Sequence, residues 1–288
     1  MAMMRVICDL KNGSKVSRGR GGMPHWATRL PRADMPRSAR AVSPHDKPVV
    51  HLLAFTTPHS CVLLQCWLRW MGVWMSDPHA SAEIKLTVQS YLPDANFSSP
   101  KSRWRHVLLQ RISCVYNMLE QLPVGSTFLF TDLDVVPFRP LTTLLPLPAE
   151  LTYMREPPGH GGRTGRHIAN SGLFGVRVNP KTRKFFGHLK WLAKQYPRLM
   201  DQDLVNWLLL AKPGNSMHHP VQWATWPNTL VTGLLGEVTS ETVAYHAIFA
   251  NETSIKLAKL SEAFRRRYGV GAPSVPPCEP SSHCIQSK

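Results

Sequence analysis

Between Pro48 and Thr131 the sequence alternates between strand-like and helix-like patterns, and this alternation restricts the fold more than any other feature. Apolar or alternating runs predict strands, and apolar residues at helical spacing predict helices between them. The predicted strands are residues 49–57, 83–92 and 127–131, and the predicted helices cover about residues 59–71 and 102–122. Strands joined by short helical connections pair in parallel. We therefore expect one α/β domain with a mainly parallel sheet flanked by helices.

An Asp-x-Asp pair, Asp132 and Asp134, directly follows the third predicted strand. On a continuing strand the two side chains would point the same way, because side chains alternate with a period of two. Neighbouring carboxylates repel and are costly to desolvate, and Mn²⁺ or Mg²⁺ would resolve both problems and leave positions open for phosphate oxygens. The alternative is an ordinary turn, where aspartate is common. Ligands of such sheets bind outside the carboxyl ends of strands, so Thr56, at the end of the first strand, is a nucleotide-side candidate by position.

The chain beyond Pro140 predicts further strands and helices of the same domain. The predicted strands are residues 151–155, 168–178 and 242–246, and helices begin at Pro180, Asp201 and about Ser254, the last ending near Tyr268. Asp201 is a natural N-cap. The glycine-rich residues 156–167 are not followed at once by a helix, so we interpret them as a surface loop that could act as a lid.

Both ends of the chain differ in composition from this body. Residues 1–47 are rich in Arg, Gly, Pro and Ser and are expected to be disordered, residues 48–268 form the domain, and residues 269–288 are a Pro/Ser-rich tail. No apolar run has the length of a membrane helix. The N-terminus carries no convincing signal peptide. The chain as given is expected to be soluble, without a membrane span.

The charge favours nucleotide substrates over nucleic acids. Lys and Arg number 34 against 18 Asp and Glu, a net charge of +16, and residues 1–47 hold ten basic and three acidic residues, a net +7. The rest of the charge is spread without a run of four basic residues, and no zinc-finger, RNP or basic-zipper pattern occurs. A basic balance also suits an enzyme that binds a nucleotide diphosphate. We expect no nucleic-acid partner.

The cysteines and sequons carry weaker signals. Cys61, Cys66 and Cys114 fall in apolar helical patterns and are interpreted as core thiols, whereas Cys278 and Cys284 in the tail could form a surface disulfide. Three Asn-x-Ser/Thr sequons, at Asn12, Asn96 and Asn251, are compatible with a lumenal protein and also arise by chance.

Four segments in a fixed order carry a family resemblance. They are residues 128–136 with Asp132 and Asp134, residues 170–177 beginning Asn-Ser-Gly, residues 201–206 beginning Asp-Gln, and residues 246–256 beginning with His and ending with Lys. Together they resemble the nucleotide-diphospho-sugar transferases of GT-A fold, most closely glycosyltransferase family 77, over roughly residues 48–264. The resemblance implies a Rossmann-like mixed, mainly parallel sheet, a nucleotide-sugar donor such as a UDP-sugar, a glycan or glycoprotein acceptor, transfer with retention, and residence in the Golgi lumen.

The same resemblance implies roles for individual residues. Asp134 and His246 would ligate Mn²⁺, with Asp132 on the metal or the ribose. Lys256 would pair with the β-phosphate and Arg111 with the donor, and each could instead be a solvated or snorkelling side chain. His246 could be an ordinary sheet histidine.

For the transfer step the resemblance points to the Asp-Gln pair. Asp201 and Gln202 would lie beside the anomeric carbon, although Asp201 could merely cap its helix. Asn170 would hold the donor sugar or simply shape a turn. No strong nucleophile is evident, so the departing phosphate is expected to act as base in a front-face displacement.

Three other readings stay open at this point. A family 32-like α-mannosyl- or galactosyltransferase shares the Asp-x-Asp pattern, but the glycine pair usual before that strand is missing here. A nucleotidyltransferase would need a Gly/Lys-rich loop after the first strand, and residues 57–60 supply none. A basic polyanion- or RNA-binding protein with an inactive fold would depend on residues 1–47 for its affinity.

Overall fold

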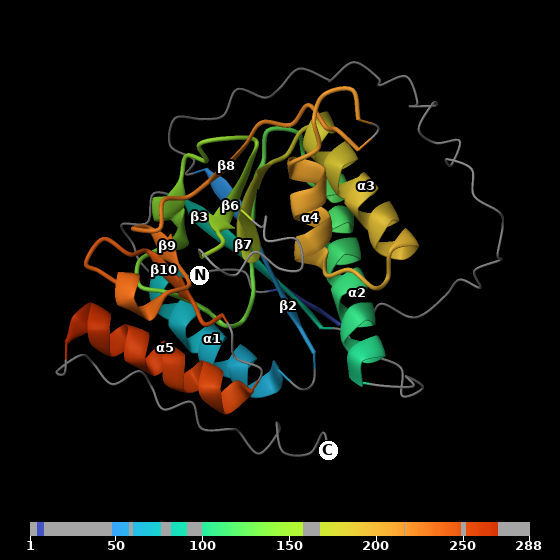
Figure 1. Ribbon diagram of the computed structural model, residues 1–288. Coiled ribbons are helices and arrows are strands. Elements are labelled where there is room, and N and C mark those ends of the chain that lie inside the picture. The colour runs from blue at the N-terminus through green and yellow to red at the C-terminus, as the bar shows by residue number, and fades with distance from the viewer. Residues whose placement is uncertain are drawn as a thin grey trace.

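A seven-stranded sheet forms the centre of the computed structural model, which describes residues 5–8, 48–57, 60–75, 82–90, 100–157, 168–215, 217–248 and 252–269 (Figure 1). The strand order is β1-β3-β2-β4-β7-β6-β8. Its strands are β1 (Arg5–Cys8), β2 (Val49–Thr56), β3 (Glu83–Ser90), β4 (Thr127–Thr131), β6 (Leu151–Arg155), β7 (Ala169–Arg177) and β8 (Trp223–Thr225).

The sheet is mixed and mainly parallel, as predicted. Strands β1, β3, β2 and β4 pair in parallel, β7 runs antiparallel to both β4 and β6, and β8 pairs in parallel with β6. Because β7 runs in the opposite direction, its first residues lie at the edge where β2 and β4 end, with Leu173 opposite Thr131. This edge therefore gathers the Asp-x-Asp and Asn-Ser-Gly segments.

Helices cover both faces of the sheet because the strands carry apolar side chains on both faces. Leu52 and Ala54 of β2 face a core shared with α1 (Cys61–Met75) and α5 (Thr253–Tyr268). Leu53 and Phe55 face a second core formed with α2 (Pro100–Gln121), α3 (Pro180–Gln195) and α4 (Asp201–Leu209). Figure 1 shows these two helical layers on opposite sides of the strands.

A small second sheet continues the chain beyond β4. It has the order β5-β10-β9 and consists of β5 (Val135–Pro137), β10 (Ala244–His246) and β9 (Val231–Thr232). Strand β5 is antiparallel to β10, with Val135 opposite His246. Strand β4 ends at Thr131, as predicted, and residues 133–134 form a turn that carries the chain from one sheet to the other.

Three local predictions need correction. Arg5–Cys8, in a segment expected to lack structure, pairs as the edge strand β1, which its β-branched Val6 and Ile7 favour. Asp201 is the first residue of α4 rather than its N-cap, which is Met200. Cys66 is buried and disulfide-bonded rather than a free thiol, whereas Cys114 is the free, buried thiol predicted.

Several predictions fall outside the described residues. They include most of the glycine-rich segment (residues 158–167), the rest of residues 1–47, residues 270–288 with both tail cysteines, and the three sequons. In the described part of the chain, no helix combines the length and apolar character that a bilayer crossing requires.

Candidate active site

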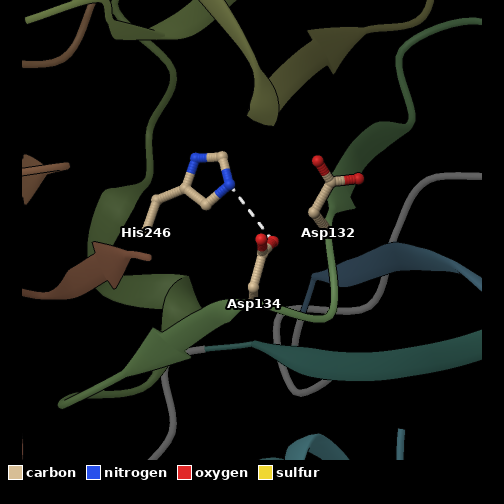
Figure 2. Close-up of side chains that lie close together, drawn as sticks. All are labelled: Asp132, Asp134 and His246. Atoms are coloured by element: carbon tan, nitrogen blue, oxygen red, sulfur yellow. Dashed lines mark ion pairs between the residues drawn. The ribbon is translucent and has the colours of Figure 1, made fainter. Parts of the chain in front are cut away.

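Asp132, Asp134 and His246 converge at the carboxyl edge of the main sheet. One potential ligand atom from each residue lies within 4.8 Å of the others. Figure 2 shows the three side chains pointing toward one another, Asp132 and Asp134 from the turn after β4 and His246 from the end of β10. The β5–β10 pairing makes this contact, and the amide of Ala247 also donates to the Asp134 carbonyl over 2.8 Å. The chain thus joins residues more than a hundred positions apart into one acidic and imidazole cluster.

Asp134 is the buried member of the cluster. His246 Nε2 lies 3.2 Å from its Oδ1, and Lys256 Nζ of α5 donates to its Oδ2 over 2.5 Å. Burial alone would raise the pKa of Asp134, but His246 and Lys256 outweigh it and hold that pKa well below its ordinary value. The carboxylate is therefore ionised, although its side chain is only 8% exposed.

Asp132 is held by an arginine from α2. Arg111 Nη1 donates to both carboxylate oxygens of Asp132, over 2.7 and 3.0 Å. Its guanidinium also lies over the Phe130 ring, 5.4 Å from the centroid. Asp132 keeps 25% of its side chain exposed. It is the carboxylate of the pair that solvent, or a ligand, can reach.

Arg111 also reaches the start of α4. Its Nη2 donates to Ser171 Oγ over 3.1 Å and forms an ion pair with Asp201. Ser171 Oγ in turn donates to Asp201 Oδ2 over 3.2 Å. Asp201 is buried. One guanidinium therefore joins the Asp-x-Asp turn, the Asn-Ser-Gly strand and the Asp-Gln helix.

The Asn-Ser-Gly segment shapes the wall of the cluster. Asn170 donates to Glu156 Oε2 over 2.6 Å and accepts from the amide of Gly172 over 2.8 Å. The His246 ring lies against Gly172, where a Cβ would come within 2.1 Å of His246 Cε1. The amide of Ser171 donates to Gln202 Oε1 over 3.4 Å. All four sequence segments singled out above meet here.

A comparison with protein families decides the classification. The profile described as "Nucleotide-diphospho-sugar transferase" matches residues 80–260, more than half of the chain. The chain belongs to this family. The match confirms that it is a glycosyltransferase, while the narrower likeness to family 77 stays a prediction.

A search of solved structures supports the GT-A fold. A glycosyltransferase involved in glycosylation of the major capsid of PBCV-1 aligns with a TM-score of 0.52 and 13% identity, over 74% of this chain and 100% of that one. The galactosyltransferase LgtC, solved with donor and acceptor sugar analogs, gives 0.47 and 12%, over 74% and 95% of the two chains. Mouse xyloside xylosyltransferase 1 gives 0.44 and 14%, over 70% and 98%. Comparison with curated protein sequences finds no match.

The structure brings together all but one of the predicted site residues of the transferase. Lys256 contacts the cluster directly and is neither free nor merely solvated. Arg111 is an internal bridge rather than a snorkelling side chain. Thr56 is the exception: it lies buried at the end of β2, and its hydroxyl donates to the Thr57 carbonyl over 3.2 Å rather than to the acidic cluster.

Some residues that shape the transferase site had no role assigned from the sequence, although Ser171, Gly172 and Asn206 lie in the segments that carry the resemblance. Ser171, Gly172 and Glu156 complete the hydrogen bonds and packing described above. Asn206 fixes α4 to β7: its Oδ1 accepts from the amides of Ile168 and Ala169 over 2.8 and 3.0 Å, and its Nδ2 donates to the Ala169 carbonyl over 2.7 Å. The sequence did offer a signal for this role, because Asn206 is a polar residue on the apolar face of α4, between Val205 and Leu208.

Proposed function

We propose that this transferase moves a sugar from a UDP-sugar to a hydroxyl of a glycan or glycoprotein, with a divalent cation and with retention of configuration. The observation that carries the proposal is the convergence of Asp132, Asp134 and His246 at the ligand-binding edge of the sheet. Membership of a nucleotide-diphospho-sugar transferase family supports the donor class.

The residues present fit a hard divalent cation. Two carboxylates and an imidazole form a donor set suited to Mn²⁺ or Mg²⁺, and their ligand atoms are already within 4.8 Å of one another. Asp132, Asp134 and His246 would hold the ion. His246 Nδ1 is buried and has no hydrogen-bond partner among the described residues, and the contact of the ring through Nε2 is with Asp134, another member of the set. When bound, the ion would neutralise the negative charge of the diphosphate leaving group.

The charges around this set suit a divalent cation, and with the ion bound they suit a donor with negative charge. Three carboxylates (Asp132, Asp134, Asp201) face two cations (Arg111, Lys256), which leaves one net negative charge, 3 − 2, before any metal binds. Lys256 would turn from Asp134 toward the β-phosphate of the donor, as a point charge. Arg111 would keep Asp132 and Asp201 in place and contact the donor. Asn170 would contact the donor sugar, and Thr56 stays a positional candidate on the nucleotide side.

Asp201 and Gln202 would act at the anomeric carbon. In a front-face displacement the bond from the anomeric carbon to the phosphate oxygen breaks, and the acceptor oxygen bonds to the same face of that carbon. The acceptor proton passes to the departing phosphate. Asp201, buried and ion-paired with Arg111, would stabilise the positive charge on the sugar ring. Gln202 would hydrogen-bond the sugar.

A donor-hydrolysis panel tests this function. The full-length chain is incubated with UDP-glucose, UDP-galactose, UDP-xylose or UDP-N-acetylglucosamine, in Mn²⁺ or in EDTA, and UDP release is measured. We expect slow release from one donor, abolished by EDTA and by Asp134→Asn. Glu262→Gln, which removes the half-buried carboxylate of α5 that pairs with Arg265 and Arg266, is the matched control and should keep the activity. Release that persists in EDTA and in Asp134→Asn would contradict the metal site.

We also propose residence in the Golgi lumen. The buried disulfide-bonded Cys66 supports an oxidising compartment. Expression of the tagged chain in cultured cells, with co-staining for a Golgi marker, tests this location. A cytosolic distribution with Cys66 in its reduced form would rule it out.

A further inference from the structure

A groove of about 330 Å³ opens beside Asp201, on the face of the sheet that α2, α3 and α4 cover. It runs between α2, the connection from α3 to α4, and the start of α4, which pack together in Figure 1. Its floor is aliphatic and includes Leu108, Leu109 and Ile112 of α2 with Leu199 and Leu204. Asp201 lines the same groove. The groove therefore leads to a side chain that the proposed function places at the transferred sugar.

Two arginines give the groove its charge. Arg105 of α2 and Arg198 of the α3–α4 connection both line it. Neither forms an ion pair with any residue in the part of the chain that the structure describes, in contrast to Arg111, Arg265 and Arg266. Arg198 is exposed and Arg105 is half-buried. An anionic ligand group would find unpaired guanidinium donors here.

Asp201 is the single carboxylate in the lining, and it determines which end of a bound ligand would face which residues. Asp201 repels an anion and accepts a hydrogen bond from a hydroxyl, whereas Arg105 and Arg198 attract an anion. A ligand that places a hydroxyl at Asp201 and a carboxylate at the arginines satisfies both ends. Apart from His106, the rest of the lining is apolar, so a ring rich in hydroxyls would be desolvated there with little compensation. An apolar side chain fits this floor.

From these contacts we propose that the groove binds the acceptor as a polypeptide, with an aliphatic side chain on the floor, an Asp or Glu at Arg105 and Arg198, and the accepting hydroxyl at Asp201. This assignment rests on the proposed function, because it takes Asp201 to lie at the transferred sugar. It narrows the acceptor class from any glycan or glycoprotein to an acidic, aliphatic peptide segment.

Selection from a peptide library tests the groove. Peptides of eight residues with one central Ser or Thr and all other positions degenerate are passed over the immobilised full-length chain, without donor or metal, and the retained pool is sequenced. We expect enrichment of Asp or Glu and of Leu, Ile or Val at fixed distances from the hydroxyl, with the acidic enrichment about threefold for each guanidinium engaged. Arg105→Glu with Arg198→Glu should abolish the acidic enrichment, and Leu199→Ser should reduce the aliphatic one.

A matched pair of substitutions controls for net charge. Arg265→Glu with Lys212→Glu makes the same change in charge at exposed positions outside the groove and should leave both enrichments intact. No acidic enrichment in the wild type, or the same loss in both double variants, would overturn the proposal. The selection contains no donor, so its failure alongside Mn²⁺-dependent UDP release would reject only the peptide acceptor. Failure of UDP release alongside a positive selection would reject only the transferase chemistry.

Discussion

The ring of His246 occupies the space where any residue other than glycine at position 172 would place its Cβ. That Cβ would come within 2.1 Å of His246 Cε1 and 2.6 Å of Nδ1. Gly172 belongs to β7 of the main sheet and His246 to β10 of the small sheet. The glycine of the Asn-Ser-Gly segment thus lets the two sheets approach closely enough for the imidazole to face Asp134.

Gly172→Ala is therefore expected to displace His246. Overpacking of a filled site costs about 1–3 kcal/mol in the free energy of unfolding, and the displaced ring should bind Mn²⁺ less tightly. Urea denaturation and Mn²⁺ titration of the purified variant measure the two effects. Gly236→Ala is the matched control, because a Cβ at Gly236 meets no heavy atom within 4 Å. Equal behaviour of the two variants would show that His246 can move without cost.

Arg111 should matter for stability as well as for catalysis. In Arg111→Met, the buried Asp201 keeps Ser171 but loses its cation, and a buried carboxylate left without its partner costs about 3–5 kcal/mol. Arg111→Lys should cost less, since it keeps the charge and loses the forked contacts with Asp132. Chemical denaturation of both variants gives the two free energies.

The control for Arg111 is Arg266→Met on α5. Arg266 pairs with Glu262 at the surface, and its side chain is 48% exposed. Exposed pairs contribute about 0–1 kcal/mol, so this variant should unfold close to the wild type. A loss in Arg111→Met no larger than in Arg266→Met would refute the bridging role.

Long periodic patterns in the sequence predicted most strands of the main sheet. Most of the shortest strands of the structure carry no such pattern and were not predicted from it. β6 has the predicted bounds, Leu151–Arg155, and the predicted parallel pairing of β2 with β3 and β4 is confirmed. The predicted strand 242–246 contains β10 (Ala244–His246). In contrast, β5 and β9 have only three and two residues. Such segments are too short for a period to appear, and their pairing is decided by contacts between distant parts of the chain. The pairing that forms the second sheet could not be predicted for this reason.

In the site, too, residues marked by their neighbouring sequence could be predicted, and contacts between residues far apart in the chain could not. Asp132 and Asp134 stood out because they follow a buried strand directly. The partnership of Arg111 with Asp201 links α2 to α4 across ninety positions, 201 − 111, and no local pattern reports it. Asp201 was interpreted as a helix cap because aspartate at a helix start usually is one. Here Asp203 Oδ2 accepts from the Met200 amide instead, over 3.0 Å, which leaves Asp201 to its ion pair.

Lys256 is expected to contribute mainly to donor affinity. If its ammonium turns to the β-phosphate, Lys256→Met removes a charge-assisted hydrogen bond worth about 1.5–3 kcal/mol, and kcat/KM for the donor should fall about 10- to 150-fold, chiefly through KM. Steady-state UDP release at varied donor concentration separates the two constants. Lys212→Met removes an exposed lysine outside the cluster and serves as control. An unchanged donor KM in Lys256→Met would mean that the lysine only neutralises Asp134.

Acid should weaken the fold through a histidine pair remote from the acidic cluster. His188 Nδ1 of α3 lies 2.7 Å from His219 Nε2. Burial lowers the pKa of His219 to about 4, with further lowering from His188, Lys184 and His218, and burial with Lys184 lowers the pKa of His188. The unfolded chain binds a proton on each imidazole near pH 6.5, and the folded chain does so only at lower pH. Stability from this pair is therefore complete above about pH 6.5 and is lost as the pH falls toward 4.

The variant His219→Gln isolates this pair. Glutamine cannot take up a proton at position 219, so the fall in the urea midpoint between pH 7 and pH 4.5 should be smaller than in the wild type. The difference between the two proteins should grow steadily as the pH drops below about 6.5, because that is where the unfolded wild type begins to bind the extra proton. Parallel curves over the whole range would show that His219 is protonated in the folded chain as readily as in the unfolded one.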